Sequence, residues 1–141
     1  MKYCIGIDPD LDASGVAVAE DGKIKSLECL TLHDLFFYLW SHKEVIKKVY
    51  LEAGWLNHKV NFHTNKNALS REKTAYHVGI NHCVGMMIEK ELKEQGIPYV
   101  LIKPFATKKN HEQFCRMTGW DVKIRTNQEK RDAGMLCYAH L

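Results

Sequence analysis

The apolar positions of the first thirty residues follow a strand-like pattern that is broken by two turns. They predict strands over Lys2–Asp8, Ser14–Glu20 and Lys23–Leu30. Asp21-Gly22, between the second and third strands, is a two-residue hairpin signal, because a type I′ turn needs positive φ at both central positions. The three strands are therefore predicted to form an antiparallel meander.

Helical and strand patterns alternate along the rest of the chain. Apolar residues at helical spacing predict a helix over Thr31–Ser41, and a fourth strand, Val45–Glu52, follows it. Residues 53–70 are polar and poorly periodic, which predicts a long loop with some helical content. The remaining elements are predicted to be a long helix, a fifth strand and two further helices, over Arg71–Gln95, Tyr99–Ile102, Ala106–Met117 and Asn127–His140.

This order of elements is an α/β pattern in which an antiparallel meander leads into parallel crossovers. With 141 residues and 45% hydrophobic content the chain can bury one core, so a single domain is predicted over residues 1–141. Gly79 and Gly85 stand inside the long helix, where each glycine costs about 1 kcal/mol relative to alanine. Close approach of this helix to a sheet or to a second subunit would explain them.

Cysteine usage and the absence of targeting signals predict an intracellular protein. The five cysteines are odd in number and include no CxxC pair, which favours free thiols. No signal peptide precedes Lys2, and no apolar run approaches the roughly 18 residues that span a bilayer. No histidine stands in an HExxH or a Cys/His zinc spacing. We therefore predict a soluble, cytoplasmic protein that does not associate with membranes.

Basic residues gather in two stretches, although the formal net charge is only +3. Eight Lys and Arg residues lie between Lys103 and Arg131, where only three acidic residues oppose them, and a second group follows the middle of the chain. Such stretches suit a polyanion such as nucleic acid, and a solvated basic face explains them equally well. The candidate nucleic-acid contacts are Lys59, Lys66, Arg71, Lys73, Lys103, Lys108 and Lys109.

Carboxylates stand at the ends of buried elements. Asp8 ends the first strand, Glu52 ends the fourth, and Asp132 begins the apolar part of the last helix, with Glu129 three residues earlier on the same face. Carboxylates are depleted in strands and costly to bury without a partner. Each one alone is explained as well by a helix cap, a salt bridge or an exposed position. Together they predict a site at one edge of the sheet, because parallel neighbouring strands end at the same edge.

The chemistry of this donor set is that of a divalent metal site. Hard carboxylate oxygens suit Mg²⁺ or Mn²⁺, which also bind water and substrate phosphate oxygens. Two such ions, roughly 3.5–4 Å apart, activate a water and stabilise the leaving oxygen in phosphodiester cleavage. The acidic positions therefore favour a nuclease.

Motif order and spacing agree with a known family. The segment Ile5-Gly6-Ile7-Asp8-Pro9 followed by Ser14-Gly15-Val16-Ala17-Val18, the strand end Val49-Tyr50-Leu51-Glu52, and the last helix from Asp132 to His140 resemble the corresponding segments of RuvC-type Holliday junction resolvases. That family lies within the ribonuclease H-like superfamily. The resemblance spans nearly the whole chain and implies a ribonuclease H-like fold, with a five-stranded mixed sheet that combines the antiparallel meander with parallel strands and is flanked by helices.

The resemblance also implies a function and a set of functional residues. It implies a metal-dependent, structure-selective endonuclease that resolves Holliday junctions or other branched DNA by phosphodiester hydrolysis. The implied metal ligands are the acidic tetrad Asp8, Glu52, Glu129 and Asp132, which would bind Mg²⁺, with Mn²⁺ as a substitute. Lys109 is the implied catalytic lysine that stabilises the developing phosphate charge, and Lys103 lies where the family carries basic residues. The resemblance also implies a homodimer that packs through the long helix. A phage or another mobile element is a source that fits a resolvase of this small size.

Several positions depart from the family pattern and leave alternatives open. Asp10 stands where the family usually has Gly, and Glu129 replaces the commoner Asp. The segment 53–70 is longer than expected, and Trp55 and Phe62 are its candidates for the aromatic that the family inserts near the junction centre. The alternatives are a nuclease of the same fold acting on RNA/DNA hybrids or flaps, and a catalytically silent junction-binding module. A nucleotide-binding relative of the actin and sugar-kinase type would need two such domains.

Overall fold

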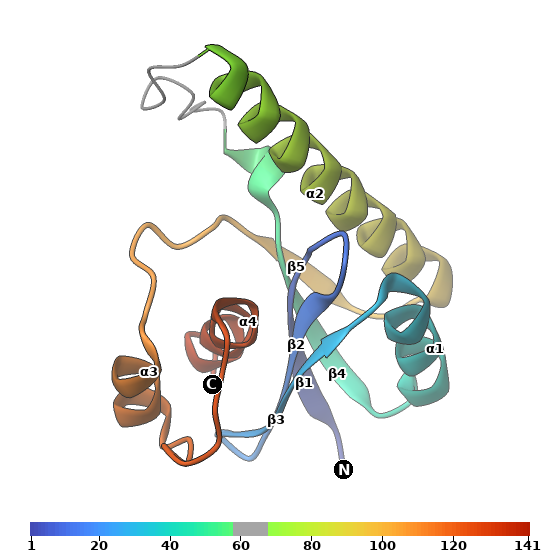
Figure 1. Cartoon of the computed structure of the whole chain (residues 1–141). Coiled ribbons are helices and arrows are strands. Elements are labelled where there is room, and N and C mark those ends of the chain that lie inside the picture. The colour runs from blue at the N-terminus through green and yellow to red at the C-terminus, as the bar shows by residue number, and fades with distance from the viewer. Residues whose placement is uncertain (58–67) are drawn as a thin grey trace.

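The computed structural model describes residues 1–57 and 68–141, which form one mixed five-stranded sheet in the order β3-β2-β1-β4-β5, with helices on both sides (Figure 1). The strands are β1 Tyr3–Asp8, β2 Ser14–Glu20, β3 Lys23–Leu30, β4 Ile46–Glu52 and β5 Tyr99–Ile102. The helices are α1 Leu32–His42, the 3₁₀ turn η1 Gly54–Leu56, α2 Ala68–Gln95, α3 His111–Thr118 and α4 Gln128–Tyr138. This arrangement confirms the predicted five-stranded mixed sheet flanked by helices.

The sheet combines an antiparallel half with a parallel half. β1 pairs with β2 and β2 with β3 in antiparallel fashion, whereas β4 runs parallel to both β1 and β5. The hairpin between β2 and β3 turns at Asp21 and Gly22, whose φ angles are 51° and 73°. Both values are positive, as the predicted two-residue turn requires.

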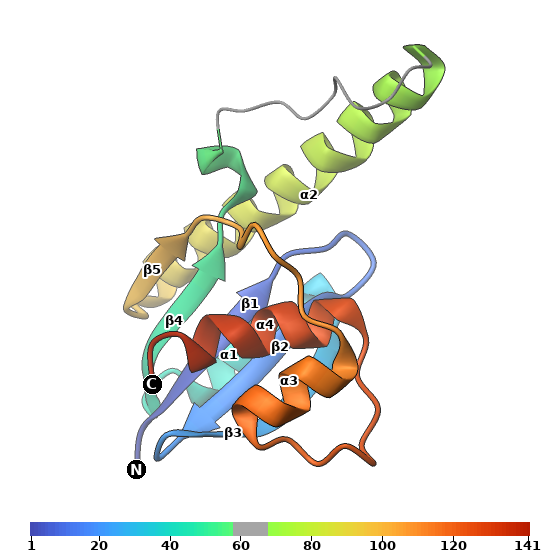
Figure 2. The same ribbon diagram turned by 90° about the vertical axis from the view of Figure 1, so that its left-hand side faces the viewer.

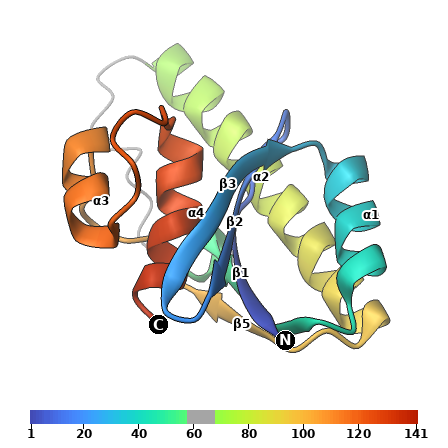
Figure 3. The ribbon, with the colours of Figure 1, turned by 90° about the horizontal axis from the view of Figure 1, so that it is seen from below.

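Two helical layers cover opposite faces of the sheet, with α1 and α2 on one side and α3 and α4 on the other (Figure 3). Side chains alternate along β1, so Ile5 and Ile7 enter the core beneath α1 and α2, where Leu35 and Ile88 are also fully buried. The opposite face of the sheet packs against α4 and α3 through a second cluster that includes Ala17, Phe114 and Ala133.

Helix α4 lies directly on β1 and β2 because two strand residues have no side chain. A Cβ added at Gly6 would collide with the carbonyl oxygen of Ala133, and one added at Gly15 would collide with the carbonyl oxygen of Glu129. The separation between α4 and the sheet is therefore set by contacts of the main chain. Substitution by any larger residue would push the helix away.

Helix α2 is the longest element and extends beyond the sheet at its N-terminal end (Figure 2). It begins three residues earlier than predicted and is buried only near its middle and C-terminal end. Close approach is found at Gly85, where an added Cβ would collide with the ring of Trp55, whereas one at Gly79 would meet nothing within 4 Å. Neither α2 nor any other described helix has the length and apolar character needed to cross a membrane.

The predicted start of α3 is wrong by five residues. The sequence favoured a helix from Ala106, but α3 begins at His111 because Asn110 caps it. The Asn110 side chain accepts a hydrogen bond from the Gln113 amide at 2.8 Å, and the Gln113 side chain accepts one from the Asn110 amide at 3.0 Å. Residues 103–110 are irregular instead, and they pass beside α4.

Candidate metal centre

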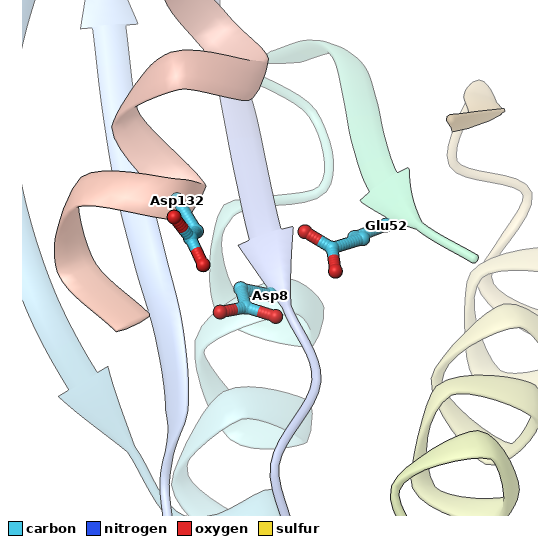
Figure 4. Close-up of side chains that lie close together, drawn as sticks. All are labelled: Asp8, Glu52 and Asp132. Atoms are coloured by element: carbon cyan, nitrogen blue, oxygen red, sulfur yellow. The ribbon is translucent and has the colours of Figure 1, made fainter. Parts of the chain in front are cut away.

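Two carboxylates of the centre come from neighbouring parallel strands. β1 and β4 are paired in register from Cys4 and Lys48 to Ile7 and Leu51, so Asp8 and Glu52 are the next residues at the same edge (Figure 4). Apolar residues of both strands, such as Ile7 of β1 and Leu51 of β4, are buried directly before the two acids, which are themselves only partly buried. The prediction that the two strand ends lie together is therefore confirmed.

The third carboxylate comes from the opposite layer. Asp132 lies in the second turn of α4 and is 8% exposed. Since α4 rests on Gly6 and Gly15, the side chain of Asp132 reaches the ends of β1 and β4. One oxygen from each of Asp8, Glu52 and Asp132 lies within 4.8 Å of the others, and the three side chains point toward one another (Figure 4).

The electrostatics of this cluster are unfavourable for three ionised acids. Burial, followed by the negative charges of Glu52 and Asp132, raises the pKa of Asp8 to about 8. Burial also raises the pKa of Glu52, which the charge of Lys108 opposes. The Oε2 atom of Glu52 is buried and has no hydrogen-bond partner within the described part of the chain. A buried carboxylate oxygen left in this way is costly.

Lys108 partly compensates the negative charge. Its Nζ donates to Oδ2 of Asp132 at 2.7 Å. Burial acts to lower the pKa of Lys108, but the hydrogen bond to Asp132 and the charges of Glu52, Asp132 and Asp8 outweigh it, so the pKa is raised. One ammonium therefore faces three carboxylates, which leaves the cluster short of positive charge.

The residues present fit a hard divalent cation. All three converging groups are carboxylates, and one of their buried oxygens lacks a partner among the described residues. Such oxygens are the ligands that Mg²⁺, Mn²⁺ and Ca²⁺ take in proteins. No histidine or cysteine joins this group in the described part of the chain, so the donor set differs from that of a structural zinc site.

Glu129, the fourth predicted acid, lies near this cluster but outside it. It occupies the first turn of α4, where its carbonyl oxygen lies over Gly15. Its charge contributes the smallest of the effects that raise the pKa of Asp8. The structure thus brings together three of the four predicted acids, and a ligand role for Glu129 stays a prediction.

Lys108, and not Lys109, makes the direct contact with the carboxylates. The family resemblance implied Lys109, at the start of a predicted helix, but the segment that carries both lysines is irregular. Lys109 lines a cavity of about 290 Å³ with Phe105, Asp132 and Met135. Its carbonyl oxygen accepts a hydrogen bond from Arg131 Nε at 2.8 Å. Adjacent lysines in an irregular segment have no periodicity that would show which of them faces the site.

The other predicted nucleic-acid contacts are described only in part. Arg71 and Lys73 are exposed near the start of α2, and Lys103 is exposed just after β5. Lys59 and Lys66, together with Phe62, lie outside the described residues. Contact of these residues with nucleic acid stays a prediction.

A cleft of about 210 Å³ opens beside the carboxylates. It is lined by Asp8 and Glu52 together with Trp55, Asn81 and His82. The side-chain oxygen of Asn81 accepts from the Leu11 amide at 3.2 Å, which joins the β1–β2 loop to α2. No motif in the sequence singles out Asn81, and His82 stands in no metal-binding spacing. Both residues reach the cleft because α2 crosses the strand ends. The helical pattern of the sequence does not predict where that crossing lies.

Asp10, which departs from the expected glycine, stabilises its own turn. Its Oδ2 accepts hydrogen bonds from the Asp12 and Ala13 amides at 3.1 and 3.4 Å. Its Oδ1 accepts from Asn81 at 3.5 Å. Asp10 is absent from the group of three converging acids, so its role in the described structure is to shape the loop after Asp8.

Comparison with known proteins gives a likeness of structure only. No protein-family model and no curated protein sequence matches this chain. Among solved structures, Thermus thermophilus RuvC in complex with a Holliday junction substrate matches with a TM-score of 0.61 and 15% identity, over 99% of this chain and 92% of that one. The chain has a RuvC-like fold. A second RuvC structure from the same organism matches with a TM-score of 0.60 and 16% identity, over 98% of this chain and 92% of that one.

The RuvC-like fold accounts for where the carboxylates meet. The match covers nearly the whole of both chains, so it includes β1, β4 and α4, which carry Asp8, Glu52 and Asp132. At 15% identity the likeness concerns the fold alone. The chemistry must therefore be argued from the cluster itself.

Proposed function

We propose that residues 1–141 form one RuvC-like nuclease domain, a divalent-metal-dependent endonuclease that cleaves branched DNA and, above all, four-way junctions. The observation that carries this proposal is the convergence of Asp8, Glu52 and Asp132 within 4.8 Å. Three acids from three elements are costly to hold together unless a cation joins them. The fold supports the choice of reaction, since the matched RuvC structure holds a Holliday junction substrate.

Asp8, Glu52 and Asp132 would hold the metal, which we propose is Mg²⁺ with Mn²⁺ as a substitute, and Glu129 would complete the acidic set. When bound, divalent ions in such a site lower the pKa of water and stabilise charge on the phosphate and the leaving oxygen. The chain's own part is to fix the carboxylates at the strand ends and on α4. The half-exposed Lys108 ammonium adds positive charge beside them.

The predicted basic residues would bind the DNA backbone. Lys109 and Lys103 lie on the segment that passes beside the centre, and we propose that Lys109 stabilises the developing phosphate charge. Arg71 and Lys73 on α2, with Lys59 and Lys66, would contact the arms of the substrate. Neutralising phosphates in this way makes binding weaken as salt increases.

Substrate choice is tested by direct competition. A four-way junction, a linear duplex, a flap and an RNA/DNA hybrid with the same sequence are mixed with the protein and Mg²⁺ or Mn²⁺. We expect the junction to be cleaved at least about tenfold faster than the others, which corresponds to about 1.4 kcal/mol in the transition state. Faster cleavage of the hybrid or flap would favour the ribonuclease H-like alternative. Tight junction binding without product at any metal concentration would favour a silent binding module.

We also propose that α2 joins two copies of the chain. Tyr76, Gly79, Cys83 and Met86 follow one another at spacings of three and four residues, so they share a face of α2. Tyr76 is 67% and Met86 46% exposed, and Gly79 and Cys83 are exposed too. An exposed face with small residues at its centre suits close packing against a second helix.

A short thiol-reactive cross-linker tests this dimer. We expect it to join two chains through Cys83, and Cys83→Ser to abolish the product. Light scattering at micromolar concentration should give the mass of two chains without DNA and of two chains plus one junction with it. A single chain under both conditions would contradict the dimer.

A further inference from the structure

Gln128 is joined to the metal centre by a hydrogen bond that no chemistry described so far requires. It stands four residues before Asp132 on α4, a spacing that places the two side chains on one face. Its Nε2 donates to Oδ1 of Asp132 at 2.7 Å. Lys108 donates to the other oxygen, Oδ2, also at 2.7 Å. Each oxygen of Asp132 therefore has its own donor.

The two oxygens of Asp132 face different surroundings. The Lys108 ammonium that holds Oδ2 lies close enough to Asp8 and Glu52 for their charges to act on it as well. Oδ1 is held by Gln128, whose Nε2 also lies 3.5 Å from the Lys109 carbonyl oxygen. The amide thus holds the oxygen that faces away from the lysine.

Arg131 decides which way the Gln128 amide points. Its Nη2 donates to Oε1 of Gln128 at 3.0 Å. A guanidinium only donates hydrogen bonds, so the group facing it must be the amide oxygen, and the amide nitrogen must face Asp132. A flipped amide would set donor against donor at one end and oxygen against carboxylate at the other.

Arg131 is itself fixed by the main chain on two sides. Its Nε donates to the carbonyl oxygen of Lys109 at 2.8 Å, and its Nη1 donates to the carbonyl oxygen of Thr126 at 3.1 Å. The guanidinium therefore ties the segment that carries Lys108 to the start of α4. The same network orients Gln128, so it fixes Asp132 and Lys108 relative to each other.

We propose that Gln128 is a positioning residue for metal binding, which holds Oδ1 of Asp132 and so fixes how the Asp132 carboxylate is presented to Asp8 and Glu52. This inference rests on the proposed function, because it assigns the metal to the same three acids. A neutral amide suits this role, because it orients the carboxylate without neutralising the charge that attracts the cation. Partners of metal ligands of this kind commonly change metal affinity by about 10–100-fold when they are removed.

The test measures Mn²⁺ binding by calorimetry in the absence of DNA. Gln128→Met keeps the length of the side chain and removes the donor. Gln128→Leu is a second neutral variant, which removes both the donor and the acceptor of the amide without changing the charge of the site. We expect both to weaken Mn²⁺ binding at least about tenfold, while the melting temperature without metal shows that each variant remains folded at the temperature of the titration.

Gln95 offers a matched control. Its Nε2 donates to Oε1 of Glu91 at 3.0 Å, again four residues apart on a helix, but on α2 and outside the metal centre. Gln95→Met removes the same kind of bond and should leave Mn²⁺ affinity unchanged. Wild-type affinity in either folded Gln128 variant would overturn the positioning role and leave the proposed function intact. Absence of Mn²⁺ binding by the wild type, or unchanged binding in Asp132→Asn, would overturn both.

Discussion

Replacing Asp8 by asparagine is expected to lower the rate of four-way junction cleavage at least about a thousandfold, or about 4 kcal/mol of transition-state stabilisation. Asp8 converges with Glu52 and Asp132 in the cluster, and the amide removes one of the three negative charges that hold a cation. The fold should persist, because the neutral side chain relieves repulsion among buried acids. Junction binding should also persist, since it depends on basic residues.

Single-turnover cleavage and gel-shift binding of the same labelled junction measure these two effects. Asp12→Asn is the matched control: Asp12 is exposed on the loop that follows Asp8 and does not belong to the converging acids. It should cleave at the wild-type rate. Cleavage by the Asp8 variant within tenfold of wild type would remove Asp8 from the proposed centre.

The stability of the metal-free protein is expected to fall as pH rises from about 4 to about 8. Burial and the neighbouring charges raise the pKa of Asp8 from 3.8 to about 8 in the folded protein. The unfolded chain releases this proton near pH 4, whereas the folded chain keeps it until about pH 8. Between these values the folded state binds more protons, so the free energy of unfolding decreases with pH. Each pKa unit is about 1.4 kcal/mol, so the full effect is several kcal/mol.

Thermal unfolding in the presence of a chelator, at pH 5 and pH 8, measures this dependence. Because other groups also titrate, the decisive quantity is the difference between Asp8→Asn and the wild type. The variant should gain stability over the wild type as pH rises, and added Mn²⁺ should restore the wild type at pH 8. A difference that stays constant with pH would show that Asp8 is already ionised in the folded protein.

Local patterns were enough to predict most of the fold. The bounds of β2, β3 and β5 agree with the alternation of apolar residues, and the Asp21-Gly22 turn has the positive φ angles that its sequence favours. The start of α3 was predicted wrongly because residues 106–109 have no helix breaker. The reciprocal cap between Asn110 and Gln113 is a weaker local signal, and it determines where the helix begins.

The metal centre was only partly accessible from sequence. Asp8 and Glu52 were predicted to meet because strand order and direction alone bring parallel strand ends together. Lys108, Asn81 and Gln128 were not singled out as its neighbours. Their contacts depend on how an irregular segment and two helices approach the strand ends, and on side-chain rotamers, and no periodicity encodes these.

The glycine contacts beneath α4 bear on how this chain can diverge in sequence. Because Gly6 and Gly15 contact main-chain atoms of α4, these contacts set the separation between α4 and β1 and thus between Asp132 and Asp8. Side-chain packing elsewhere in the core has less influence on that separation. Most core residues can then be exchanged for others of similar volume without moving the carboxylates. A chain built in this way can keep the arrangement of its carboxylates while its sequence diverges, and the fold that it shares with RuvC persists at 15% identity.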